Sequence, residues 1–402
     1  MTTARQFFPR PKTSGEDHRV TTFELLFDLV FVFAFTQVTG FMAHSHSAFG
    51  VLQAMVILAI IWWSWTSYGW LANQTHVDEG VVRAGMAVAM GAMFVVALVI
   101  PESFEDLPGG LSGPIVFVVA YFVVRVIHGA LYFIAAGDDT GLRRQIIRSS
   151  VAVFTGIALL LAGAIVGGQW QTWLWLAGIV LDIILTWVTS IGGAWRLQSP
   201  AHWTERYGLI VILALGESVV AIGAGAAHEP ISVPLLAGAV LAIGLSFLLW
   251  WLYFDVIASA AEWFLNKATG VKRAELASFG YTYGHFLLIA GIVISALGVE
   301  ETIAEVTKDE PVGLFTASAL FGGTSLYLIG HALFWRLLGG EWNWWRVGGS
   351  TLLLALIPIA AGLTALASLA LVVAVVVAVV VLESRHYAQQ RTHLRAVNSE
   401  KA

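Results

Sequence analysis

Apolar residues fall in long blocks along the chain, and short polar stretches separate the blocks. The hydrocarbon core of a bilayer is about 30 Å thick, so a helix that crosses it needs about 20 apolar residues. This rule predicts twelve membrane-spanning helices. They cover residues 22–43, 49–69, 81–101, 112–135, 149–167, 171–192, 206–226, 233–255, 275–298, 312–335, 347–363 and 365–382. The pattern therefore predicts an all-α fold, a polytopic helical bundle in a membrane.

Two of these boundaries depend on an expected turn rather than on a polar loop. The stretch between Arg346 and Glu383 carries no charge and is too long for one crossing, so we expect a turn near Gly362. The stretch 149–192 needs a similar turn at residues 167–169.

The positive charges predict the orientation of the chain. Nineteen of the 21 lysines and arginines fall in the two tails or in even-numbered connections between spans, if Arg83 and Arg206, at the ends of their spans, are counted with the adjoining connections. Of the other two, Lys308 lies in an odd-numbered connection and Arg125 lies inside a span. Because positive charge is retained in the cytoplasm, we expect a multi-pass protein of the inner (cytoplasmic) membrane with both termini cytoplasmic.

Twelve spans that start and end on the same side are compatible with two parallel six-helix repeats. The segment FDLVFVFAF (27–35) aligns with GESVVAIGA (216–224), and this alignment pairs Asp28 with Glu217. The expected organisation is a cytoplasmic tail (1–21), a first repeat (22–192), a second repeat (206–382) and a cytoplasmic C-terminal tail (383–402).

Composition narrows the class of protein further. Hydrophobic residues make up 58% of the chain and charged residues 12%, against about 25% charged in soluble proteins. The basic residues form no stripe, which argues against nucleic-acid binding. The chain has no cysteine, and it contains no H-E-x-x-H, G-x-S-x-G or Walker motif. We therefore expect no catalytic motif, no cofactor and no metal site.

Ionisable residues inside the spans are the candidates for function, because each costs about 2.5–3.5 kcal/mol at mid-bilayer on insertion scales. Glu24 and Asp28 are four residues apart, so they share one face of the first helix. The predicted transport-pathway or ion-binding residues are Glu24, Asp28, Arg125, His128, Asp182, Glu217, His285 and His331.

Two carboxylates as close as Glu24 and Asp28 repel each other when both are charged. A bound cation, a bound proton or a nearby arginine, for which Arg19 and Arg125 are candidates, would relieve this repulsion. Ion pairs that only fix helix packing are an alternative interpretation. We favour a polar pathway because three carboxylates deep in the predicted spans, Asp28, Asp182 and Glu217, stand against one arginine there, Arg125.

Two segments resemble a known family. HRVTTFELLFDLVFVFAFTQ (18–37) and ERYGLIVILALGESVVAIG (205–223) are similar to the two hallmark segments of the bacterial low temperature requirement A family of integral membrane proteins. The resemblance covers nearly the whole chain in length and number of spans. It implies that the family's acidic positions fall on Glu24, Asp28 and Glu217 and its basic position on Arg206. The family name refers to growth in the cold and implies no reaction.

The leading hypothesis for function is a transporter or ion channel with an acidic and histidine-lined pathway for a small cation or proton. One alternative is an intramembrane enzyme that acts on lipid or another apolar substrate, with Glu24 and Asp28 as an acid–base pair. A second alternative is a membrane scaffold. The expected partner is the lipid bilayer, and the sequence leaves open whether the protein is an oligomer.

Overall fold

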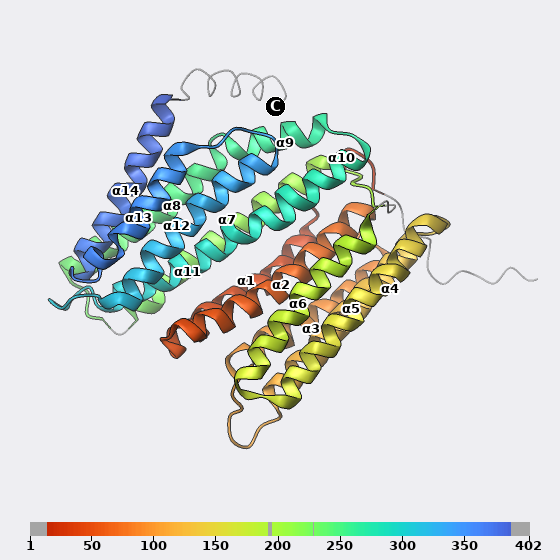
Figure 1. Cartoon of the computed structure of the whole chain (residues 1–402), viewed down its shortest axis with the longest axis horizontal. Helices are drawn as coiled ribbons and strands as arrows, with labels where there is room; N and C mark the ends of the chain where they lie inside the picture. Colours follow the sequence, from red (N-terminus) through yellow and green to blue (C-terminus); the bar gives the residue numbers. More distant parts are fainter. Residues whose placement is uncertain (1–13, 192–194, 228, 387–402) are drawn as a thin grey trace, which may run out of the picture. The chain divides into compact units, whose positions relative to one another are not determined.

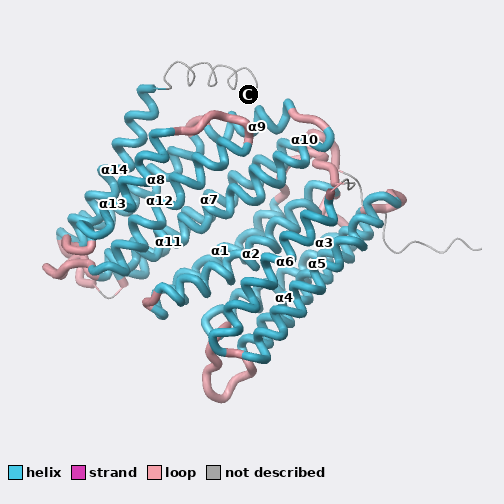
Figure 2. The backbone as a smooth tube through the Cα atoms, in the orientation of Figure 1, coloured by secondary structure: helices cyan, strands magenta, loops and turns pink. Residues whose placement is uncertain are grey.

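The computed structural model describes residues 14–191, 195–227 and 229–386 of the chain. Within these residues the regular elements are helices, and no β-strand occurs (Figure 2). Eleven helices of the described part are long and apolar enough to cross a membrane, and a shorter apolar helix, α13 (Trp344–Ala360), makes the twelfth. The predicted all-α polytopic membrane bundle is therefore confirmed.

The chain divides into two compact units (Figure 1). The N-terminal unit comprises Met1–Val38 and Leu52–Glu205, as far as these are described. Its helices are α1 (Thr22–Ser45, up to Val38), α2 (Ala48–Gln74, from Leu52), α3 (Gly80–Val99), the 3₁₀ turn η1 (Ile100–Glu102), α4 (Gly113–Ala135), α5 (Thr140–Val166), α6 (Gly168–Ser190) and the first turn of α7 (Pro200–Ala226).

The C-terminal unit comprises Thr39–Val51 and Arg206–Ala402, again as far as described. Its helices are the rest of α7, then α8 (Val233–Phe254), α9 (Ile257–Lys267), α10 (Gly270–Glu275), the π-helix η2 (Leu276–Tyr283), α11 (Gly284–Ala304), α12 (Gly313–Leu337), α13 and α14 (Ala365–His386). Helices α8 and α9 form one long apolar stretch, and α10, η2 and α11 form another. The two-repeat organisation remains a prediction.

Three helices with polar N-caps begin three or more residues earlier than the hydrophobic pattern predicts, because the caps precede their apolar parts. Helix α5 begins at Thr140 rather than at residue 149, and the Asp139 side chain accepts a hydrogen bond from the Leu142 amide at 2.9 Å. Helix α7 begins at Pro200 rather than 206, and α13 at Trp344 rather than 347. Capping side chains satisfy amides that a helix start leaves free, so they extend a helix beyond its apolar segment.

The two turns expected between closely spaced spans lie where the apolar pattern predicts them. Helix α5 ends at Val166, and Gly167 and Gly168 both have positive φ angles, which glycine adopts without strain. Helix α13 ends at Ala360 and α14 begins at Ala365.

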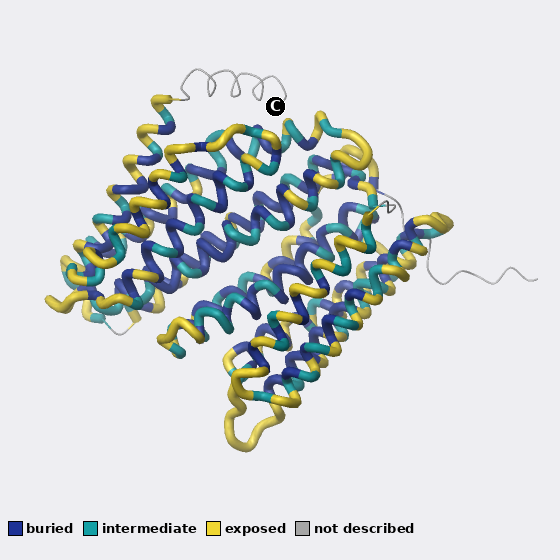
Figure 3. The backbone as a smooth tube through the Cα atoms, viewed as in Figure 1, coloured by how far each residue is buried: buried dark blue, intermediate teal, exposed yellow. Residues whose placement is uncertain are grey.

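Glycine allows close packing inside the C-terminal unit. A Cβ atom at Gly298 of α11 would lie 2.2 Å from the Leu320 amide nitrogen of α12, and one at Gly323 would lie 2.3 Å from the Ser295 amide nitrogen. The backbones of these helices are therefore in direct contact. Figure 3 shows α11 as a largely buried helix, in agreement with this packing.

Candidate functional site

The first turn of α1 is closed by a reciprocal pair of hydrogen bonds between Thr21 and Glu24. The Glu24 amide donates to Thr21 Oγ1 at 3.3 Å, and the Thr21 amide donates to Glu24 Oε1 at 3.1 Å. The Thr21 hydroxyl also donates to Glu24 Oε1 at 3.1 Å. This is a capping box, in which the first and fourth residues of a T-x-x-E segment satisfy each other's free amides. It gives Glu24 a defined local structural role.

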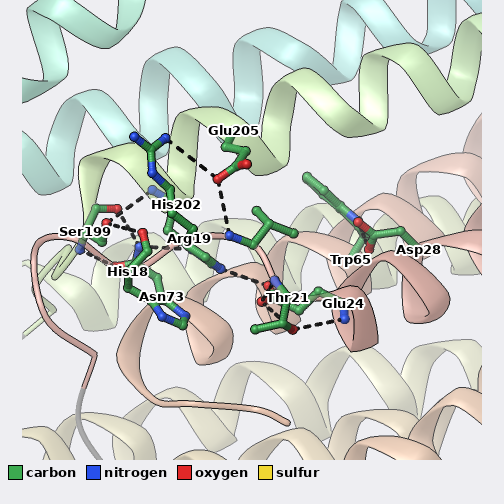
Figure 4. A network of polar contacts seen from close by, with 11 residues as sticks. His18, Arg19, Thr21, Glu24, Asp28, Trp65, Asn73, Ser199, His202 and Glu205 are labelled. Carbon is green, nitrogen blue, oxygen red and sulfur yellow. Dashed lines mark hydrogen bonds and ion pairs between the residues drawn. The ribbon is translucent and has the colours of Figure 1, made fainter. Parts of the chain in front are cut away.

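His202 holds the other carboxylate oxygen of Glu24. The imidazole Nε2 lies 2.8 Å from Glu24 Oε2, and both side chains are fully buried. His202 occupies the first turn of α7, where the Ser199 hydroxyl accepts a hydrogen bond from its amide at 3.1 Å. Proline at the first helical position and serine before it are typical of a helix start. Figure 4 shows these contacts within the N-terminal unit.

Asn73, at the end of α2, fixes the orientation of His202. Its Oδ1 accepts from the amides of Gln198 at 2.7 Å and Ser199 at 3.3 Å. Its Nδ2 donates to the Ser199 carbonyl at 2.6 Å and lies 3.3 Å from His202 Nδ1. Because the amide nitrogen is a donor, this geometry assigns the imidazole proton of His202 to Nε2, which then donates to Glu24.

His18, just before α1, completes a buried group. Its ring stacks on the His202 ring with 4.7 Å between centroids, and the His76 ring meets it edge-on at the same distance. The Ser199 hydroxyl holds the His18 backbone carbonyl at 3.0 Å. Burial, followed by the nearby His202, lowers the pKa of His18 to about 4. We call His18, Glu24 and His202 the His–Glu cluster.

Asp28 lies one helical turn beyond Glu24 and is fully buried. The indole nitrogen of Trp65 on α2 donates to Asp28 Oδ1 at 2.9 Å. Arg19 and Arg125, which the sequence offers as partners for these carboxylates, form other ion pairs. Arg19 lies 3.9 Å from Glu205 and Arg125 lies 3.1 Å from Asp182.

Arg125, His128 and Asp182 come together in a second part of the N-terminal unit. The Arg125 guanidinium on α4 donates to Asp182 on α6 at 3.1 Å and to the Ser67 hydroxyl on α2 at 2.9 Å. The ring Nε2 of His128 lies 3.0 Å from the Ser67 carbonyl oxygen. Thr186 donates to the other oxygen of Asp182 at 3.2 Å. These bonds join three helices through one buried ion pair.

In the C-terminal unit, His285 lies in an aromatic environment next to the π-helix η2. The Tyr253 hydroxyl donates to His285 Nε2 at 2.8 Å, and His285 Nδ1 donates to the Tyr281 carbonyl at 3.1 Å. Both ring nitrogens are therefore satisfied within this unit. Glu217 is buried on α7 of the same unit, within electrostatic reach of Glu300 on α11.

His331 accepts a hydrogen bond from a second buried ion pair. Arg346 of α13 donates to both carboxylate oxygens of Glu383 on α14 at 2.8 Å each, and to His331 Nδ1 at 2.6 Å. It also donates to the Leu252 carbonyl at 3.0 Å. Sequence reasoning assigns Arg346 to a loop, but α13 begins at Trp344, so this arginine lies inside a helix and is buried.

Arg206 shows the same effect. Helix α7 begins six residues before the predicted start of its span, so Arg206 lies within the helix and is fully buried. The interpretation that one arginine faces three carboxylates in the interior is therefore wrong, because Arg125, Arg206 and Arg346 are all buried in the described part of the chain.

Sequence reasoning missed several members of these networks, namely His18, Asn73, Ser199, His202, Arg346 and Glu383. One signal in the sequence could have found two of them, because Ser199 followed by Pro200 is a helix start that places His202 in the first turn. The T-x-x-E segment at residues 21–24 likewise predicts the capping box of Glu24. The contacts between these two helix starts depend on tertiary structure.

The apolar helices and the charged side chains buried among them define the class of multi-pass integral membrane proteins. The family described as "Bacterial low temperature requirement A protein (LtrA)" matches residues 19–381, so the chain belongs to this family. The chain is 28% identical over 375 residues to the uncharacterized protein RA0937 of Rhizobium meliloti (strain 1021). The alignment covers 89% of this chain and 87% of that protein. No solved structure gives a significant match.

Proposed function

We propose that this LtrA-family protein is a transport protein that moves a small cation or a proton across the membrane, with Asp28 and Glu217 as its ion-handling carboxylates. The observation that carries the proposal is an excess of acid over arginine among the buried side chains of the described residues. The buried carboxylates there are Glu24, Asp28, Asp182, Glu217 and Glu383, and the buried arginines are Arg125, Arg206 and Arg346.

The two ion pairs within the units account for part of this charge. Arg125 neutralises Asp182, and Arg346 neutralises Glu383. When these two pairs are set aside, the buried side chains of the described residues still include three carboxylates, those of Glu24, Asp28 and Glu217, and one arginine, Arg206. A carboxylate beyond that balance is stabilised by hydrogen bonds or a cation, or it takes up a proton. Each of these states is useful in a protein that handles cations or protons.

Among the residues of the predicted site, Asp28 and Glu217 handle the ion, and Glu24 belongs to the His–Glu cluster. The remaining members fix helices to one another through the bonds described above: Arg125, His128, Asp182, His285 and His331.

Flux measurements in proteoliposomes test this proposal. The purified protein is expected to move protons or small cations faster than protein-free liposomes leak them. Asp28→Asn and Glu217→Gln each remove a negative charge at nearly constant shape, and we expect each to lower the flux at least tenfold. Glu105→Gln, at an exposed loop position, is the matched control and should keep the parental rate. A parent that moves no protons, alkali cations or divalent cations would refute the proposal, as would Asp28→Asn and Glu217→Gln proteins with parental flux.

The two buried ion pairs favour a second candidate function, a membrane scaffold. Ion pairs with only a structural role, fixing helices to one another, are what a membrane scaffold requires. Absence of flux in the parent protein, together with intact folding, would select the scaffold.

We also propose an inner-membrane location with both termini in the cytoplasm. The support is the asymmetry of lysine and arginine between alternate connections.

A further inference from the structure

The His–Glu cluster combines three side chains that are known metal ligands. One ligand atom from each of His18, Glu24 and His202 lies within 4.8 Å of the other two, and all three residues are buried. They come from three places in the N-terminal unit: the segment before α1, the first turn of α1 and the first turn of α7. We propose that this cluster binds one divalent transition-metal ion of the zinc class.

The chemistry of the donors selects the class of ion. Two imidazole nitrogens and one carboxylate oxygen suit Zn²⁺ and its first-row neighbours, which prefer nitrogen ligands. Ca²⁺ and Mg²⁺ require sets of oxygen ligands, which this cluster does not offer. Three protein ligands also leave a fourth tetrahedral position for water or for another ligand.

An independent observation at His18 points to a ligand. Its Nε2 atom is buried and has no hydrogen-bond partner within the described structure. Only 8% of the residue is exposed. A buried polar atom in this state costs free energy, and a bound cation would satisfy it. The His18 ring stacks on the His202 ring, which in turn bonds to Glu24.

Asn73 sets the condition under which the ion binds. In this structure the proton of His202 is on Nε2, the nitrogen that would coordinate the metal. Coordination requires this proton to move to Nδ1, which then faces the amide nitrogen of Asn73, a donor, at 3.3 Å. Metal-bound histidines normally donate their other N–H to an acceptor. Asn73 therefore weakens the site.

Metal binding to the purified full-length protein tests the proposal without any measurement of transport. The protein carries an affinity tag without histidine, is stripped with a chelator and is titrated with Zn²⁺ in detergent by calorimetry, with metal content checked by mass spectrometry. We expect one Zn²⁺ per chain. His18→Ala and His202→Gln should each weaken binding at least tenfold. His44→Gln, at an exposed position near the end of α1, is the control and should bind like the parent.

Circular dichroism and gel filtration establish that each variant is folded. A parent that binds less than half an equivalent of Zn²⁺ overturns the proposal, and so does a folded His18→Ala protein with parental affinity. Zn²⁺ binding without ion flux would support this site and refute the transport proposal, so the two are separable.

Discussion

Arg125 and Asp182 illustrate how a charge is held inside this protein at the scale of single residues. Their side chains are 4% and 5% exposed, so both charges have lost most of their water. Burying two charges costs several kcal/mol per ion, roughly, and the attraction between them offsets this only with good geometry and further hydrogen bonds. Ser67 and Thr186 supply those bonds. The pair is therefore much more sensitive to the loss of one partner than to the replacement of both.

A comparison of a single and a double variant at this pair tests the argument quantitatively. Arg125→Met leaves Asp182 buried without its arginine, and we expect the free energy of unfolding to fall by about 3–5 kcal/mol. The double variant Arg125→Met/Asp182→Leu removes both charges and should recover most of that loss. Unfolding by SDS, followed by circular dichroism, measures each value.

The exposed pair of Lys272 and Glu275, at 3.5 Å, serves as the comparison. Lys272→Met should change the free energy of unfolding by about 0–1 kcal/mol, because water screens this pair. A single variant Arg125→Met as stable as the parent would contradict the structural role assigned to the buried pair.

At the scale of helices, the apolar blocks predict which elements exist, and polar caps decide where those elements begin. The span starting at residue 206 is part of a helix that begins at Pro200, because Ser199 caps it. This extension places Arg206 inside α7, whereas the hydrophobic pattern makes it the first residue of the predicted span. The pairing of Arg346 with Glu383 could not be predicted, because it joins two helices whose contact is set by packing. The predicted set of charges inside helices therefore lacked Arg206 and Arg346, because hydropathy does not register the polar N-caps that extend their helices.

The contact between α11 and α12 gives a prediction at this scale. Gly298→Ala adds a methyl group 2.2 Å from a backbone nitrogen of α12, so the helices must separate. We expect a loss of about 1–3 kcal/mol in the free energy of unfolding, as for overpacked cores. Gly322→Ala is the matched control, because a Cβ there would meet nothing within 4 Å.

Since alanine has a higher helix propensity than glycine, Gly322→Ala should be neutral or more stable by up to about 1 kcal/mol. The midpoint of SDS-induced unfolding separates the two variants. Equal effects of both substitutions would show that the close approach of α11 and α12 does not contribute to stability.

At the scale of the whole molecule, the absence of cysteine gives direct experimental access to the orientation of the chain. The even-numbered connections hold most of the positive charge, and this asymmetry predicts which loops face the cytoplasm. Leu111, exposed between α3 and α4, lies in an odd-numbered connection. Lys272, exposed in α10, lies in an even-numbered one. Each can be replaced by the single cysteine of an otherwise thiol-free chain.

Labelling with a membrane-impermeant maleimide then measures the side on which each loop lies. In spheroplasts, Leu111→Cys should react at once, because we expect it to face outward. Lys272→Cys should react only after the membrane is permeabilised, and the parent should give no signal because it has no thiol. Rapid labelling of Lys272→Cys in intact spheroplasts would invert the proposed orientation. It would also place the first turn of α1, and with it the His–Glu cluster, at the outer rather than the cytoplasmic surface, where the ion would reach it from the other side.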